Sequence, residues 1–121
     1  MEAILVKDQK AAAFVLEDGT FEGVCRITEK VCGDVEQVTG VRPKIIKWQG
    51  ELRPAQVYVA TLGNSEMSEA IAEEEGIELS SLRGKRECFL FQVLKNGSLL
   101  IAGSDKRGTI YGLFHISELM G

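Results

Sequence analysis

The last quarter of the chain has the most informative pattern of apolar and polar positions. An apolar run at 99–102 is followed by a polar turn with two glycines, which is typical of a short buried strand and its exit. From Ile110 onward apolar residues recur at helical spacing. The residues on this side are Ile110, Leu113, Phe114, Ile116 and Met120. The pattern predicts a strand, a turn and a helix, with Ser104 or Asp105 as the helix N-cap.

A second side of this helix is also partly apolar. Tyr111, His115 and Leu119 follow one another at a spacing of four residues and fall nearly opposite the first stripe. Leu119 is a large aliphatic residue in the last turn, where this chain offers nothing further to cover it. We therefore predict that Tyr111, His115 and Leu119 form a docking face, covered by a part of the protein beyond Gly121.

The stretch from Phe21 to Thr39 predicts a longer amphipathic helix. Its apolar positions recur at the three-four spacing, its charged residues occupy the other side, and Gly40 is the expected stop. A further helix is predicted to begin at Asn64 or Ser65, both of which are good N-caps, and to end at Gly76. Valine is a weak helix former, so tertiary burial must stabilise the longer helix.

Short apolar and alternating runs between these helices predict strands. The first two runs, 3–6 and 11–16, favour a hairpin or meander. The stretch 88–94 is apolar on both faces, which predicts a central strand. An Asn96-Gly97 turn is expected to join it antiparallel to 99–102. The remaining candidate strands are 44–48 and 55–62. We predict a single α+β domain over 1–121, with a mixed, largely antiparallel sheet of five or six strands and two long helices on one face.

Composition narrows the classes of partner. The 121 residues are 45% hydrophobic and 26% charged with a net charge of −4, as in an ordinary soluble domain. No basic stripe is present to neutralise phosphates, and no apolar run approaches the ~20 residues of a membrane helix. We expect neither nucleic acid nor a membrane as partner. The three cysteines form no CxxC pair and are interpreted as small buried hydrophobes.

The turn before the last helix is the one candidate binding site. Its Gly-x4-Gly-Thr spacing nearly matches a phosphate loop, but the lysine that should follow the second glycine is missing. Amides at a helix start beside Lys106 and Arg107 can still hold an anion such as a carboxylate. The alternative is plain capping by Ser104 or Asp105, with Lys106 and Arg107 solvated.

The residues indicate no catalytic machinery. His115 is the only histidine, and no serine or cysteine is placed by spacing to be its nucleophile. One histidine cannot build a metal cage, and the acidic residues lie on helix flanks rather than in converging pairs. We expect no metal and no cofactor.

Three segments resemble a known family. The closing stretch IAGSDKRGTIYGLFHISELMG is similar to the N-terminal domain of glycoside hydrolase family 115, the xylan α-1,2-glucuronidases. GSDKRGTIYG is the specific signature; RGKRECFLFQVL (83–94) and GVCRITEKVCGDVEQVTGVRP (23–43) support it. The likeness extends over nearly the whole chain, although Arg86 stands where the family commonly has tryptophan.

The resemblance implies an accessory α+β domain like the one that precedes the barrel in β-N-acetylhexosaminidases. A (β/α)8 barrel, absent here, would remove (4-O-methyl)-glucuronic acid from xylan side chains in a parent enzyme that family members commonly export. This domain would be non-catalytic and would pack on that barrel through Tyr111, His115 and Leu119. Ser104, Asp105, Lys106 and Arg107 would lie at the rim of its site and contact the carbohydrate. Two alternatives stay open: a stand-alone carbohydrate-binding module, for which Trp48 and Tyr58 are the candidate stacking residues, and a protein-interaction domain that dimerises through the same face.

Overall fold

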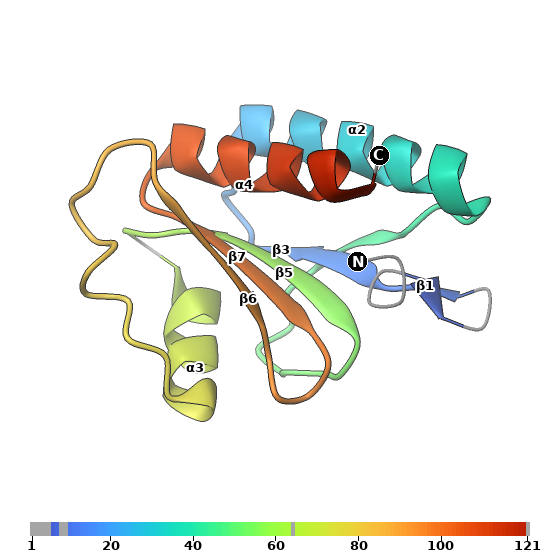
Figure 1. Ribbon diagram of the computed structural model, residues 1–121. Helices are drawn as coiled ribbons and strands as arrows, with labels where there is room; N and C mark the ends of the chain where they lie inside the picture. The colour runs from blue at the N-terminus through green and yellow to red at the C-terminus, as the bar shows by residue number, and fades with distance from the viewer. Residues whose placement is uncertain (1–5, 8–9, 64, 121) are drawn as a thin grey trace.

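A five-stranded mixed sheet forms the centre of the computed structural model, which describes residues 6–7, 10–63 and 65–120. Its strands, in spatial order, are β4 (Ile45–Lys47), β3 (Ala13–Leu16), β5 (Gln56–Thr61), β7 (Leu99–Gly103) and β6 (Phe89–Val93). Helices α2 (Glu22–Thr39) and α4 (Lys106–Met120) lie side by side over one face, and α3 (Glu66–Glu75) lies on the other (Figure 1). The predicted α+β class, with a mixed sheet and two long helices on one face, is confirmed.

The strand directions correct one part of the prediction. The sheet is largely parallel: β3 pairs in parallel with β4 and with β5, and β5 pairs in parallel with β7. Within this sheet β6 and β7 form the antiparallel pair, joined by the predicted Asn96-Gly97 turn. A largely antiparallel sheet was expected because hairpins join neighbours in sequence. Here most partners are strands that come together over a long sequence separation, across helices.

Strand β6 is a second correction, because it lies at an edge of the sheet rather than in its centre. Its side chains are still packed on both faces: Phe91 packs against the core cluster beneath α2 and α4, and Leu90 against the cluster beside α3. A strand covered on both faces has an apolar sequence on both, whether or not both of its hydrogen-bonding edges are paired. The apolar character of 88–94 on both faces matches the packing of Phe91 and Leu90, and the central position predicted from it is wrong.

The first two apolar runs form a hairpin only in part. Strands β1 (Val6–Lys7) and β2 (Lys10–Ala11) pair antiparallel in a separate two-stranded ribbon. The chain then continues into β3, which joins the main sheet in parallel. Residues 3–5 of the first predicted strand lie outside the described residues.

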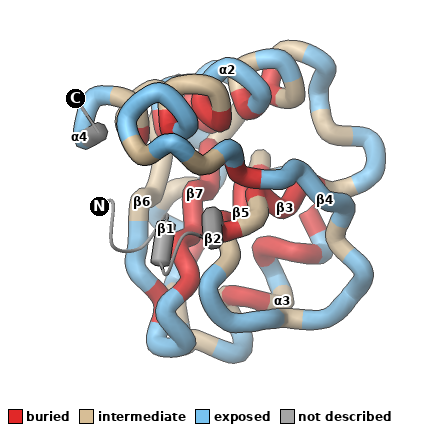
Figure 2. Tube along the Cα trace, turned by 90° about the vertical axis from the view of Figure 1, so that its right-hand side faces the viewer, coloured by how far each residue is buried: buried red, intermediate tan, exposed pale blue. Residues whose placement is uncertain are grey.

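Alternation along the strands divides the core into two clusters. Phe14, Val57 and Ile101 face α2 and α4, whereas Tyr58 and Leu100, from the same strands, face α3. The buried positions accordingly lie on both sides of the sheet (Figure 2). This is the period-two signature of strands that are covered on both faces.

The helix limits follow from local chemistry. Helix α2 ends at Gly40, whose left-handed backbone (φ 81°) lets its amide donate to the Glu36 carbonyl at 2.7 Å. Helix α3 begins at the predicted N-cap Ser65, whose hydroxyl accepts from the Ser68 amide at 3.0 Å. No helix among the described residues combines the length and the apolar character needed to cross a membrane.

Candidate functional site

The turn between β7 and α4 is held by the chain's own side chains. One Asp105 carboxylate oxygen accepts the Gly108 amide at 2.8 Å, which makes Asp105 the N-cap, one of the two residues predicted for this role. The other oxygen accepts the Glu87 amide at 3.0 Å. Because these hydrogen bonds favour the charged carboxylate, they hold the pKa of Asp105 below its usual value.

Ser104, the other candidate cap, fastens the same turn to the start of β6. Its hydroxyl accepts the Cys88 amide at 3.0 Å, and its own amide donates to the Cys88 carbonyl at 2.8 Å. The anion-binding position at the start of α4 is thus taken by the Asp105 carboxylate, and Ser104 is engaged with the neighbouring strand.

The two predicted cationic residues lie on the surface with different neighbours. Arg107 forms an ion pair with Glu87 at 2.9 Å, and this hydrogen bond raises the pKa of the guanidinium. The ammonium of Lys106 lies 6.0 Å from the centre of the Phe21 ring, at the start of α2. Both side chains are exposed and remain the part of the predicted site that an outside ligand can reach.

Three glycines allow the inner side of α4 to approach the sheet closely. A Cβ at Gly108 would lie 2.1 Å from the Cys88 carbonyl oxygen, and one at Gly103 would lie 2.2 Å from the Thr109 amide nitrogen. A Cβ at Gly112 would lie 2.5 Å from a methyl carbon of Ile101. The glycines of the GSDKRGTIYG stretch are therefore explained by packing within this chain, without a ligand.

Of the three residues of the predicted docking face, Tyr111 and Leu119 are exposed and His115 is half-buried. Tyr111 is 44% and Leu119 is 49% exposed, whereas Leu113 and Ile116 on the opposite side of α4 are fully buried. His115 packs against two β6 rings: its ring centre lies 5.7 Å from that of Phe89 and 4.9 Å from that of Phe91. Tyr111, His115 and Leu119, which we call the docking face, thus lie in one helical row.

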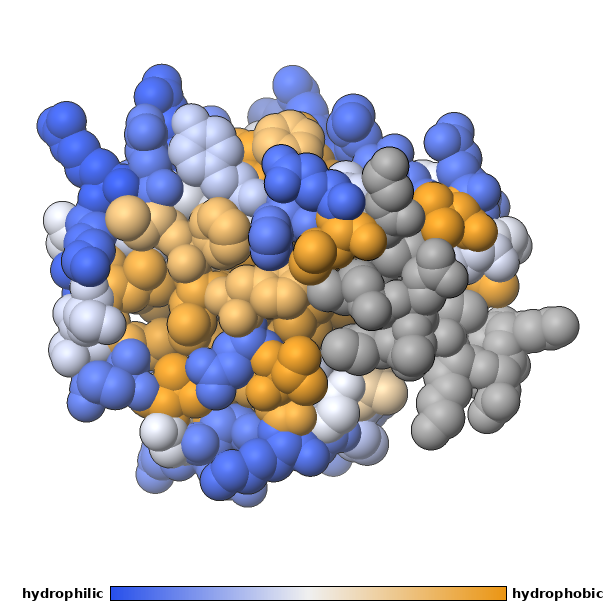
Figure 3. Space-filling model, in the orientation of Figure 1, coloured by the Kyte–Doolittle hydropathy of each residue, from blue (hydrophilic) through white to orange (hydrophobic). Residues whose placement is uncertain are grey.

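The structure extends this surface with residues that sequence reasoning missed. Phe89 and Phe91 are half-buried and Val93 is 53% exposed; we call these three alternate residues of edge strand β6 the β6 rim. Figure 3 shows a band of apolar side chains on this side of the molecule, beside α4. The apolar 88–94 run was a visible signal, but a central position for that strand would have hidden these residues. An apolar surface that continues from a helix onto a sheet edge is typical of an interaction site.

The aromatic residues considered for sugar stacking are placed unfavourably. Tyr58 is only 1% exposed, and its hydroxyl accepts the Arg53 amide and donates to the Arg53 carbonyl, both at 2.8 Å. Trp48 is half-buried and packs against the cluster beside α3. Tyr58 therefore has no open face for a sugar ring, and Trp48 has only part of its ring exposed.

The Cys32 thiol and the His115 imidazole lie in different surroundings. Burial raises the pKa of the Cys32 thiol to about 11, so that this thiol stays protonated and unreactive near neutral pH. His115 faces Glu118 at 4.0 Å on the surface. No group of three or more His, Cys, Asp or Glu residues is arranged to hold a metal ion among the residues described.

Comparison with solved structures relates this fold to glycoside hydrolases. The chain aligns over 90% of its length with a family GH115 4-O-methyl-α-glucuronidase that has specificity for decorated arabinogalactans, with a TM-score of 0.69 and 28% identity. It also aligns over 90% with CpGH84D, with a TM-score of 0.66 and 14% identity, a likeness that concerns the fold alone. The chain covers 13% of the first protein and 17% of the second. No protein-family model and no curated protein matches the sequence. The chain is therefore similar to a domain that forms a small part of glycoside hydrolase chains.

Proposed function

We propose that this chain is a non-catalytic accessory domain of a glycoside hydrolase and that it packs on the catalytic barrel of the same enzyme through the docking face. The observation that carries the proposal is the exposure of Tyr111 and Leu119, at 44% and 49%, on a helix whose Leu113 and Ile116, on the other side, are fully buried. The small share of the neighbouring enzymes that the chain covers fits a supporting role, since most of each enzyme lies outside this domain.

The β6 rim strengthens this choice of surface. Val93, the most exposed large hydrophobic residue on this side, continues the apolar row of α4 onto the sheet edge. Burial of apolar area contributes roughly 25 cal/mol per Å². A surface that spans a helix and a strand gives a second domain more apolar area to cover than a single helical row.

Introducing charges on the docking face tests the docking. In the free 121-residue chain, Tyr111→Glu combined with Leu119→Lys should leave the melting temperature nearly unchanged, because both side chains are exposed. In the full-length gene product the same pair should lower the melting temperature and make the domain sensitive to limited proteolysis. The matched control is Ile46→Lys, an exchange at a 37% exposed residue of β4, the opposite edge of the sheet. Equal behaviour of the pair and the control in the full-length protein would contradict the proposal.

The parent enzyme is proposed to be an α-glucuronidase that removes (4-O-methyl)-glucuronic acid from a polysaccharide. The xylan side chains implied by the sequence resemblance are one substrate; a decorated arabinogalactan, on which the structural neighbour acts, is the other. The free chain is expected to release no glucuronic acid from either polysaccharide, because the proposal assigns the catalytic carboxylates to the barrel. Release by the full-length protein and none by the free chain supports the assignment; release by the free chain contradicts it.

The exposed cations of the β7–α4 turn are the remaining candidates for substrate contact. We propose that Lys106 and Arg107 lie at the rim of the parent enzyme's site, where either can attract a substrate carboxylate. Lys106→Ala with Arg107→Ala should then raise KM in the full-length enzyme. An unchanged kcat and KM would remove the turn from the site and leave the docking proposal standing.

A further inference from the structure

A hollow lies at the carboxyl edge of the sheet, away from the docking face. Its volume is about 350 Å³, and its walls come from two loops, Glu17–Phe21 after β3 and Leu62–Gly63 after β5. The end of β5 forms the floor, with Val59 and Thr61. We call this hollow the switch-point pocket.

The topology explains why the two loops separate at this point. The loop after β3 leads to α2, which covers one face of the sheet, and the loop after β5 leads to α3 on the opposite face (Figure 1). These two parallel strands are neighbours, so their following loops must part and leave a crevice between them. In open parallel sheets, ligands generally bind in this crevice, outside the carboxyl ends of the strands. The pocket is therefore a consequence of the fold rather than an accident of side-chain shape.

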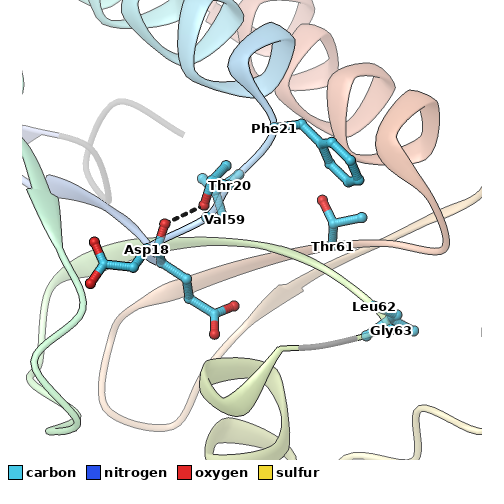
Figure 4. A pocket seen from close by; sticks show the side chains of 9 residues that line it. Asp18, Thr20, Phe21, Val59, Thr61, Leu62 and Gly63 are labelled. Atoms are coloured by element: carbon cyan, nitrogen blue, oxygen red, sulfur yellow. Dashed lines mark hydrogen bonds between the residues drawn. The ribbon is translucent and has the colours of Figure 1, made fainter.

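The lining gives the chemical character of a ligand. Figure 4 shows the Phe21 ring and the Thr61 hydroxyl on one side of the hollow and Thr20 on the other. Phe21 is 51% exposed, and the Lys106 ammonium lies over its ring at 6.0 Å from the ring centre. Glu17 and Asp18 contribute the acidic side chains of the lining. Asp18 pairs with Lys47 at 3.0 Å, Glu17 accepts from the Met67 amide at 3.1 Å, and the Lys106 ammonium lies beside the Phe21 ring. Acidic and basic side chains therefore balance around the hollow, and an aromatic ring beside oxygen acceptors suits an uncharged polyhydroxylated molecule better than an ion.

Thr61 retains hydrogen-bonding capacity toward the hollow. Its Oγ1 lies 2.6 Å from Oγ1 of the buried Thr109, which is also within reach of the Ala60 carbonyl at 3.2 Å and the Asp105 carbonyl at 3.1 Å. If Thr109 donates to one of these carbonyls, then Thr61 donates to Thr109 and keeps two lone pairs. If Thr109 instead donates to Thr61, the Thr61 proton is available. In either arrangement Thr61 can bond a ligand hydroxyl.

Backbone donors complement these acceptors. Helix α2 begins at the N-cap Phe21 without a side-chain hydrogen bond to its first turn, in contrast to the Ser65 and Asp105 caps of α3 and α4. The first amides of a helix have no intrahelical acceptor, so those of α2 start beside the pocket with donor capacity. A sugar ring, with hydroxyls that both donate and accept and an apolar face of C–H groups, matches this combination.

We propose that the switch-point pocket binds a single uncharged sugar residue, with its ring against Phe21 and a hydroxyl on Thr61. The size supports one ring rather than an extended chain, because about 350 Å³ is near the lower end of small-ligand pockets, roughly 300–1,000 Å³. The pocket would let the domain hold a neutral backbone or side-chain sugar of a polysaccharide. This site does not depend on the docking face, and its test uses the free chain.

The test is a titration of the free chain by two-dimensional NMR with three neutral probes, xylose, arabinose and galactose, and with glucuronic acid as the charged comparison. At least one neutral sugar should give saturable shifts centred on residues 18–21 and 59–63, and glucuronic acid should bind more weakly. Phe21→Ala should weaken binding at least tenfold. The matched control is Tyr111→Ala, an aromatic residue of similar exposure on the docking face, which should bind as the parent chain does.

Thr61→Val serves as a second variant, with folding checked by circular dichroism because Thr61 also pairs with Thr109. A folded variant should lose affinity without loss of the Phe21 shifts. The proposal is overturned if none of the neutral sugars binds, if glucuronic acid binds more tightly than all of them, or if Tyr111→Ala weakens binding as much as Phe21→Ala. A failure of any of these kinds leaves the docking proposal untouched, because that proposal rests on another surface and another assay.

Discussion

The two sides of helix α4 show how one element can fix a fold and still carry an interaction surface. On the inner side, Gly108, Thr109 and Leu113 are buried against the sheet, at distances that leave no room for an added methyl group at Gly108. On the outer side, Tyr111 and Leu119 are nearly half exposed. The difference teaches that the apolar residues of this helix have two separate purposes. The inner ones are needed by this chain, and the outer ones are available to a partner.

The largest loss of stability is expected from Gly108→Ala. The new Cβ would lie 2.1 Å from the Cys88 carbonyl oxygen, a backbone atom that cannot move aside without displacing the start of β6. We expect a loss of about 4 kcal/mol or more in the free energy of unfolding, measured by urea denaturation. The control is Gly23→Ala, whose Cβ would meet the flexible end of the Lys106 side chain at 2.9 Å. A similar loss in both variants would contradict the close approach of α4 to the sheet.

The same substitution on opposite sides of the helix sharpens the comparison. Leu113→Ala should lower the free energy of unfolding by about 3 kcal/mol, because the fully buried side chain leaves a cavity. Leu119→Ala should change it by no more than about 0.5 kcal/mol in the free chain, because Leu119 is half exposed. Equal losses would mean that this chain itself buries the outer side.

Sequence reasoning succeeded where one local pattern decides the structure. Helix α2 was predicted over 21–39 and is found at Glu22–Thr39, because its apolar stripe and the stop at Gly40 are both local signals. The hairpin between β6 and β7 followed in the same way from Asn96-Gly97. The N-cap Asp105 was one of two candidates, since a turn followed by a periodic run marks a helix start but does not say which side chain reaches the amide.

The parallel pairing of β3, β5 and β7 could not be predicted from local patterns. Each partner lies far away in the sequence, and an apolar strand fits equally well into a parallel or an antiparallel pair. Neither candidate surface could be predicted, for the same reason. The β6 rim depends on β6 being an edge strand, and the switch-point pocket depends on which faces α2 and α3 cover. The prediction placed binding at the β7–α4 turn, where Ser104 and Asp105 are used to join that turn to β6.

A smaller effect on stability distinguishes a charged from a neutral N-cap side chain at the start of α4. Asp105→Ala should lower the melting temperature more than Asp105→Asn, because an asparagine oxygen can still accept the Gly108 amide. The folded-state pKa of Asp105 lies below its usual value, so its stabilising contribution is complete above the unfolded pKa and is lost as the pH falls through the folded pKa. The Asn variant should lack this acid-dependent loss, which parallel melting curves down to acidic pH would measure. Identical acid profiles would contradict the role of the charged carboxylate.

The last prediction concerns the order in which the three cysteine thiols react, and it involves the smallest expected difference. Cys32 is fully buried, and its pKa is raised to about 11, whereas Cys25 and Cys88 are half-buried. With an aromatic disulfide reagent in mildly alkaline buffer, Cys32 should react last, only as the chain unfolds. Peptide mapping of the labelled thiols gives the order. Early labelling of Cys32 would show that the interface between α2 and the sheet opens more readily than its burial indicates.

The central claim is that another domain of the same protein covers the docking face, and cysteine labelling tests it most directly. Leu119→Cys in the free chain should react quickly with a maleimide, and the same variant in the full-length gene product should react many times more slowly. Ile46→Cys, on the opposite edge of the sheet, should react at similar rates in both. The account predicts protection that is confined to Leu119→Cys. Equally fast labelling of Leu119→Cys in the free chain and in the full-length protein would contradict it.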